Sequence, residues 1–98
     1  MYQPDYYKNL SIVQIEAKVI EEGFDPLRIS DPPGHVYPPH THPETKLLAF
    51  LQGGMDVTVE GQTYRCKAGD RLLIPGNVEH AARVMGEGCV YFWSEKVV

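Results

Sequence analysis

The stretch from Gly34 to Gly53, GHVYPPHTHPETKLLAFLQG, decides how the rest of the chain is interpreted. It places His40 and His42 two residues apart, directly after two prolines. In an extended segment, side chains at positions i and i+2 point to the same side, so both imidazoles can reach one point in space. A third histidine, His80, follows the turn signal at 75–77, Pro-Gly-Asn. Three converging histidines are typical of a divalent transition-metal site.

The amino-acid composition limits which kinds of protein this can be and which partners it can bind. The chain has 98 residues, which is enough for one domain, and 43% of them are hydrophobic, as in ordinary globular proteins. The net charge of −4 argues against nucleic acid and anionic membranes as partners, because both need a basic surface. No apolar run approaches the roughly 20 residues of a membrane span, and residues 1–10 lack a secretion-signal pattern. We therefore expect a cytoplasmic protein.

Residues 11–22 fit one amphipathic helix, although the same residues also alternate like a strand. The two ends favour the helix. Ser11 with Gln14 three residues later matches a capping box, in which each residue bonds the backbone of the other. Gly23 can take the left-handed conformation that often follows a helix, and the Asp-Pro pair at 25–26 prevents continuation.

From Pro26 onward, short strand-like segments alternate with turn signals. The expected strands are 27–29, 45–52, 55–60, 63–66, 71–74, 79–84 and 89–94, with breaks or turns at 53–54, 61–62, 67–70, 75–77 and 86–88. Short strands at this even spacing indicate an antiparallel sandwich or barrel. The sequence thus predicts an N-terminal arm and helix at 1–26 and one all-β domain at 27–98. Two cysteines, Cys66 and Cys89, are too few for a disulfide scaffold, and we expect both to be reduced residues of the core.

The two histidine-bearing stretches resemble the motifs of small single-domain cupins. The first motif is Gly, five residues, His-x-His, three or four residues, Glu, six residues, Gly, and the second is Gly, five residues, Pro-x-Gly-x-x-His. In this chain Gly34, His40, His42 and Gly53 match the first motif, and Gly69, Pro75 and His80 match the second. Asn77 replaces the second motif's glycine, a mild change because Asn tolerates the left-handed conformation. The resemblance implies an antiparallel jelly-roll or conical β-barrel, a metal held by the three histidines, and a homodimer.

One position departs from the family pattern. The usual glutamate ligand is replaced by Lys46, whose ammonium has no lone pair to offer a metal. Three interpretations stay open. The site is a three-histidine site completed by water, with Lys46 pointing away or paired with Glu44; or Glu44 reaches the ion instead; or Lys46 and the histidines bind an anion without a metal. Leu48 and Phe50 share the parity of Lys46 and are candidate pocket residues. We expect the tyrosines at 37, 64 and 91, Phe92 and Trp93 to be core residues, and His35 to lie on the surface.

These observations predict a metal-binding small cupin that binds or transforms a small anionic molecule. Three neutral ligands leave the 2+ charge of the ion uncompensated, which favours an anion as a further ligand. Fe, Zn, Ni, Mn and Cu all suit such a site, and spacing does not choose among them. If the protein is an enzyme, we expect a metal-dependent oxygenase or isomerase. The alternatives are a non-catalytic metabolite-binding or sensing module without metal, and a structural dimer with a vestigial pocket.

Overall fold

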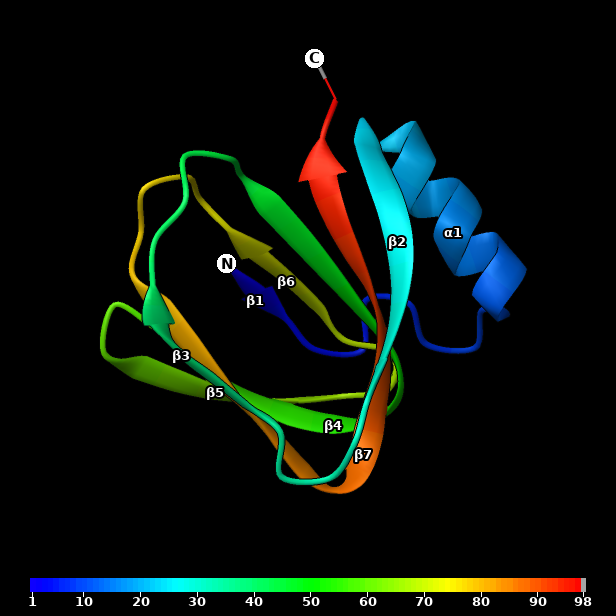
Figure 1. Ribbon diagram of the computed structural model, residues 1–98. Coiled ribbons are helices and arrows are strands. Elements are labelled where there is room, and N and C mark those ends of the chain that lie inside the picture. The colour runs from blue at the N-terminus through cyan, green and yellow to red at the C-terminus, as the bar shows by residue number, and fades with distance from the viewer. Residues whose placement is uncertain (98) are drawn as a thin grey trace.

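The computed structural model describes residues 1–97, which form seven strands and one helix. The elements are β1 (Tyr2–Gln3), α1 (Ile12–Glu21), β2 (Phe24–Asp31), β3 (Val36–His40), β4 (Lys46–Val59), β5 (Gln62–Lys67), β6 (Arg71–Ile74) and β7 (His80–Lys96). All strand pairs are antiparallel, and the sheet curls around a common interior while α1 lies outside, beside β2 (Figure 1). The predicted all-β barrel with one N-terminal helix is confirmed.

The two longest strands, β4 and β7, are the centre of the sheet. The main path of hydrogen-bonded neighbours is β1-β6-β4-β7-β2, while β3 pairs with β7 and β5 pairs with β4. The first half of β4 lies between β6 and β7, and its second half lies between β5 and β7. Each long strand therefore contributes to two walls of the barrel and bends where it passes from one wall to the other.

The predicted breaks at 53–54 and 86–88 were wrong, because the chain bends at these glycines without leaving the sheet. The β4–β7 register shifts on both sides of the bend, between Phe50 and Gln52 and between Gly53 and Met55. Gly53 has φ +73°, and a Cβ on it would lie 2.0 Å from the carbonyl oxygen of Gly88. Only glycine permits this close approach of two bending strands, so the glycines mark a bulged corner where the sequence suggested turns.

The sequence also misplaced one turn and missed two strands. The β4–β5 hairpin turns at Glu60 and Gly61, with φ +48° and +84°, one residue earlier than predicted. Positive φ at both central residues is the type I′ geometry that suits the twist of a hairpin. The strands β1 and β3 were not predicted. β3 contains Pro38 and Pro39, which cannot donate to a ladder and are tolerated only at irregular or edge positions.

The predicted helix at 11–22 is confirmed as α1, with Ser11 as its N-cap. Both hydrogen bonds of the capping box to Gln14 are present. The buried side chains Ile15 and Val19 pack into a cluster with Phe24 of β2. The helix is therefore fixed by burying one apolar stripe against the outer face of the sheet. No helix within residues 1–97 is long and apolar enough to cross a membrane.

A second, larger apolar cluster fills the barrel itself. Its buried members are Leu48, Phe50, Met55, Val57, Cys66, Leu72, Ile74, Val84, Cys89 and Tyr91. Both cysteines are free and buried. Burial raises the pKa of each thiol to about 12, so neither is a reactive thiolate at neutral pH.

The N-terminal arm is anchored by a fully buried carboxylate, Asp70. It accepts hydrogen bonds from the Tyr2 hydroxyl (2.6 Å), the backbone N–H groups of Asp5 and Lys67 (2.9 Å each) and the Lys67 ammonium (3.2 Å). Burial alone would raise the pKa of Asp70, but the hydrogen bonds outweigh burial and hold it below its usual value. This cluster joins the arm to the β5–β6 turn.

We expect Asp70→Asn to lower the free energy of unfolding by about 2 kcal/mol at pH 7, because several donors lose a charged acceptor. The folded-state pKa of Asp70 is depressed, so its contribution is present above the unfolded value of about 3.9 and is lost as pH falls from there through the folded value. Urea unfolding at pH 7 and at about pH 3 measures the difference in free energy of unfolding between wild type and variant. The exposed Asp25→Asn is the matched control. A difference that is as large at about pH 3 as at pH 7 would contradict a stabilising role for the ionised Asp70 carboxylate.

Candidate metal centre

The structure brings His40, His42 and His80 together at one end of the barrel. His40 is the last residue of β3 and lies opposite His80, the first residue of β7, in the antiparallel register. His42 lies in the loop after β3 and not in a strand, so it reaches the cluster by loop geometry. One nitrogen from each ring lies within 4.8 Å of the other two. The three side chains are therefore close enough to share one ion.

Each imidazole is held by a hydrogen bond from Nδ1 to a backbone carbonyl. The contacts are His40 to Pro38 (2.7 Å), His42 to Glu44 (3.2 Å) and His80 to Val78 (2.9 Å). A carbonyl oxygen only accepts, so in each neutral ring Nδ1 carries the proton and Nε2 carries the free lone pair. The same tether sets the orientation and the tautomer that metal-ligating histidines commonly use.

The Nε2 atoms of His42 and His80 are buried, and they have no hydrogen-bond partner within residues 1–97. Buried polar atoms are nearly always satisfied, so these two acceptors are available to an ion or another ligand. Burial, together with the charges of His40 and His42, lowers the pKa of His80 below its usual value, which keeps this ring neutral and able to coordinate. Three neutral imidazole nitrogens suit a divalent transition metal.

The turn before β7 holds the loop that carries His42. The Asn77 N–H donates to the His42 carbonyl oxygen (2.8 Å), and the Gly76 N–H donates to the Thr45 hydroxyl (3.3 Å). Asn77 has φ +64°, the left-handed conformation expected for it. A Cβ on Gly76 would lie 2.2 Å from the Pro43 carbonyl oxygen, so this position requires glycine. The second motif therefore supplies one of the three clustered histidines and positions another.

Lys46 pairs with Glu95 and not with Glu44; the pairing with Glu44 was only one of the alternatives left open by the sequence. Its Nζ lies 3.6 Å from the Glu95 carboxylate and 5.2 Å from the centroid of the Trp93 ring. Lys46 and Glu95 are direct neighbours across the β4–β7 ladder, so their side chains extend to the same side of the sheet. The His42 ring meets the same indole edge-on, at 5.8 Å between centroids. Lys46 and His42 thus both contact the indole of Trp93, and Lys46 is a buried cation whose partner is Glu95.

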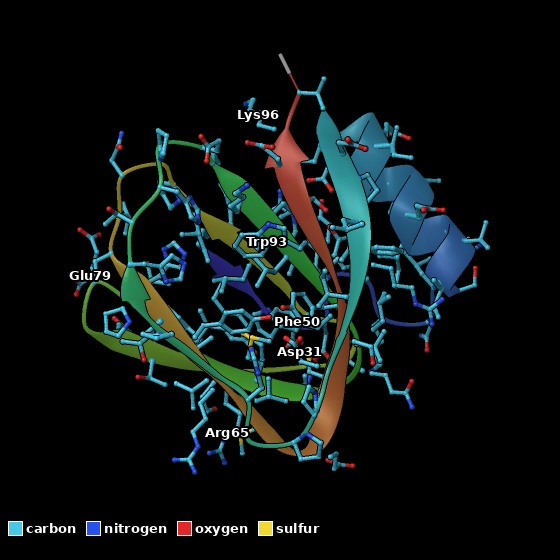
Figure 2. The ribbon with its side chains drawn as sticks, viewed as in Figure 1. Asp31, Phe50, Arg65, Glu79, Trp93 and Lys96 are labelled. Carbon is cyan, nitrogen blue, oxygen red and sulfur yellow. The ribbon has the colours of Figure 1, made fainter. Side chains whose placement is uncertain are left out.

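A cavity of about 310 Å³ extends into the barrel from the histidine cluster. His40 and His80 line it, as does Leu48, whereas Phe50 is fully buried and its ring packs against that of Tyr91. Figure 2 shows Phe50 within the barrel and Glu79 outside it.

Three aromatic residues that sequence reasoning assigned to the core also line this cavity: Tyr37, Tyr91 and Trp93. The alternation along the last strand could have indicated that residues 91 and 93 face the interior, because they lie on the same side of the strand as the buried Cys89.

The family model for the cupin domain matches residues 27–95. The chain belongs to the cupin family. The match covers both histidine motifs and every strand from the second half of β2 onward except the last residue of β7.

Three similar proteins illustrate the range of this family. Dimethylsulfoniopropionate lyase DddW of Ruegeria pomeroyi is 38% identical over 56 residues, which are 57% of this chain and 37% of that protein. The lyase DddQ of the same species superposes with a TM-score of 0.68 at 24% identity, over 76% of this chain and 38% of that one. Oxalate decarboxylase of Bacillus subtilis, which has Mn(II) centres, gives 0.66 at 20% identity, over 80% and 22%. This chain therefore spans little more than a third of the lyases, and the two structural likenesses show the fold alone.

We expect Gly76→Ala to displace the loop that carries His42 and to weaken Zn²⁺ binding by about tenfold, as loss of a positioning contact commonly does. Isothermal titration of purified protein with Zn²⁺ measures this effect. Gly86→Ala is the matched control, because a Cβ there meets no atom within 4 Å. Unchanged Zn²⁺ affinity in Gly76→Ala would show that this loop does not depend on the turn.

Proposed function

We propose that this cupin binds one divalent transition-metal ion through the Nε2 atoms of His40, His42 and His80. The observation that supports the proposal is the set of three rings tethered at Nδ1, with the Nε2 atoms of His42 and His80 buried and unpartnered within residues 1–97. A metal would satisfy these atoms. The family's glutamate position contributes no ligand here, since Lys46 is held by Glu95 and Trp93.

We propose further that the site binds a small anion, most simply a carboxylate. A bound divalent ion supplies Lewis acidity and an uncompensated positive charge. Lys46 adds a second cation that is 8% exposed, and its partner Glu95 is about half exposed. An exposed, loosely paired carboxylate is easily replaced by that of a ligand, because such ion pairs are weak in water. The charges at this end of the cavity thus favour an anionic group.

The similarity to DddW makes dimethylsulfoniopropionate, a carboxylate, the first compound to assay. Incubation with metal-loaded protein, followed by NMR of the substrate signals, tests for turnover. Consumption of the compound that stops on chelation would make the protein a metal-dependent enzyme. Binding without consumption would favour a binding or sensing module. Lys46 is the feature that favours the second possibility, because it replaces a metal ligand by an anion-binding group.

We expect wild-type protein to hold close to one equivalent of Zn²⁺ after loading and desalting, and His42→Ala to bind Zn²⁺ at least about 100-fold more weakly, since a direct ligand is lost. Metal content by mass spectrometry measures both. His35→Ala is the matched control, because the only other histidine of the chain is exposed and outside the cluster. Equal metal content in all three proteins would contradict the proposed ligands.

We expect Lys46→Met to keep its metal and to lose about fivefold in affinity for dimethylsulfoniopropionate, because one partly screened charge is removed. Lys18→Met, on the exposed face of α1, should change neither quantity. Isothermal titration of Zn²⁺-loaded proteins gives both values. A carboxylate that binds the Lys46 variant as tightly as wild type would remove Lys46 from the proposed site.

A further inference from the structure

The cavity wall carries a second polar cluster that the metal centre does not use. The hydroxyls of Tyr37 and Tyr91 both donate to the same oxygen of Asp31, at 2.7 and 2.9 Å, and lie 3.1 Å from each other. Both tyrosines line the cavity, whereas Asp31 does not. Asp31 is the last residue of β2, and its label in Figure 2 lies well apart from the end of β3. A ligand in the cavity therefore meets the phenol groups and not the carboxylate.

Counting protons shows what these phenols offer to a ligand. Each hydroxyl has one proton, and Asp31 accepts both, so the remaining hydrogen-bonding capacity of each phenol oxygen is its lone pairs. Burial is the main cause that raises the pKa of both tyrosines, so both keep their protons at neutral pH. Tyr37 and Tyr91 are thus acceptors held in place by a carboxylate, in a wall that is otherwise mostly apolar.

The positions along β3 set the size of a ligand that would reach both ends. Tyr37 precedes His40 by three residues, which is roughly 10 Å along an extended strand at ~3.3 Å per residue. A cavity of about 310 Å³ corresponds to roughly ten water-sized volumes at ~30 Å³ each. A short, linear molecule of roughly that many non-hydrogen atoms fits both the length and the volume.

We propose that the Tyr37–Tyr91 pair, held by Asp31, is a binding site for a hydrogen-bond donor, and that the ligand is a short carboxylate with a hydroxyl or ammonium group at its far end. The proposal rests on the proposed function, which places the carboxylate at the metal and Lys46. A ligand with a donor at its far end gains a hydrogen bond to these phenol oxygens that a ligand without a donor lacks. Dimethylsulfoniopropionate has no N–H or O–H at its cationic end, so the inference ranks it below a hydroxy or amino acid of similar length.

The test uses three carboxylates with the same number of non-hydrogen atoms: 6-hydroxyhexanoate, 6-aminohexanoate and heptanoate. Isothermal titration of Zn²⁺-loaded protein should show the first two binding about fivefold or more tightly than heptanoate, the value of one net hydrogen bond. Tyr37→Phe should remove most of this preference. Tyr64→Phe is the matched control, because Tyr64 packs against Tyr2 outside the cavity. Preference for the amino acid over the hydroxy acid would identify an ammonium as the donor.

Equal affinity for all three carboxylates overturns the inference. A preference for the hydroxy and amino acids over heptanoate that survives in both Tyr37→Phe and Tyr91→Phe also overturns it. The melting temperature of each variant is measured alongside to check that the variant is folded. In either case, the proposed function still holds if the protein binds the metal and binds carboxylates. Failure of every carboxylate to bind a fully metal-loaded protein overturns the inference together with the proposed anion site. Absence of metal after loading overturns the proposed metal site itself.

Discussion

The antiparallel pairing of β4 with β7 is the constraint on which the rest of the structure depends. It extends from the Lys46–Glu95 pair at one end to the Val59–His80 pair at the other. Two strands of this length stay paired around a barrel only by bending together, and the contact of Gly53 with the Gly88 carbonyl allows the bend. The ladder fixes both the ion pair of Lys46 and the start of β7, where the third histidine lies.

The histidine cluster is built from short-range contacts on top of this long-range frame. Two of the three imidazoles bond the carbonyl two residues before them, and His42 bonds the carbonyl two residues after it. These tethers fix the ring tautomers before any ion binds, which lowers the cost of organising the site. The cavity is then lined at one end by the imidazoles of His40 and His80, and elsewhere in its wall by the phenol oxygens of Tyr37 and Tyr91.

The features that were predicted from the sequence are those set by local chemistry or by spacing. The capping box of α1 and the left-handed Asn77 depend on neighbouring residues, and the motif spacing named the three histidines that the fold brings together. The errors have a common physical origin. A glycine looks the same in sequence whether it ends a strand or lets a strand bend, so the corner at Gly53 was taken for a break.

Long-range register was also out of reach of sequence reasoning. Nothing near Lys46 in the chain indicates that Glu95 is its neighbour, because the pairing depends on the register shifts at the bend between Phe50 and Met55. The prolines of β3 hid a strand whose irregular end lets both Tyr37 and His40 face the cavity. The aromatic lining followed a period-two pattern, but burial in a core and exposure to a cavity produce the same pattern.

The most direct test of the central claim is to observe the imidazole nitrogens themselves, by long-range ¹H–¹⁵N NMR of metal-free protein at mildly alkaline pH and again after addition of Zn²⁺. We expect His40, His42 and His80 all to carry the proton on Nδ1, and we expect their Nε2 resonances, but not that of His35, to shift when one equivalent of Zn²⁺ binds. Protons on Nε2, or three Nε2 resonances unmoved by saturating Zn²⁺, would contradict this central claim.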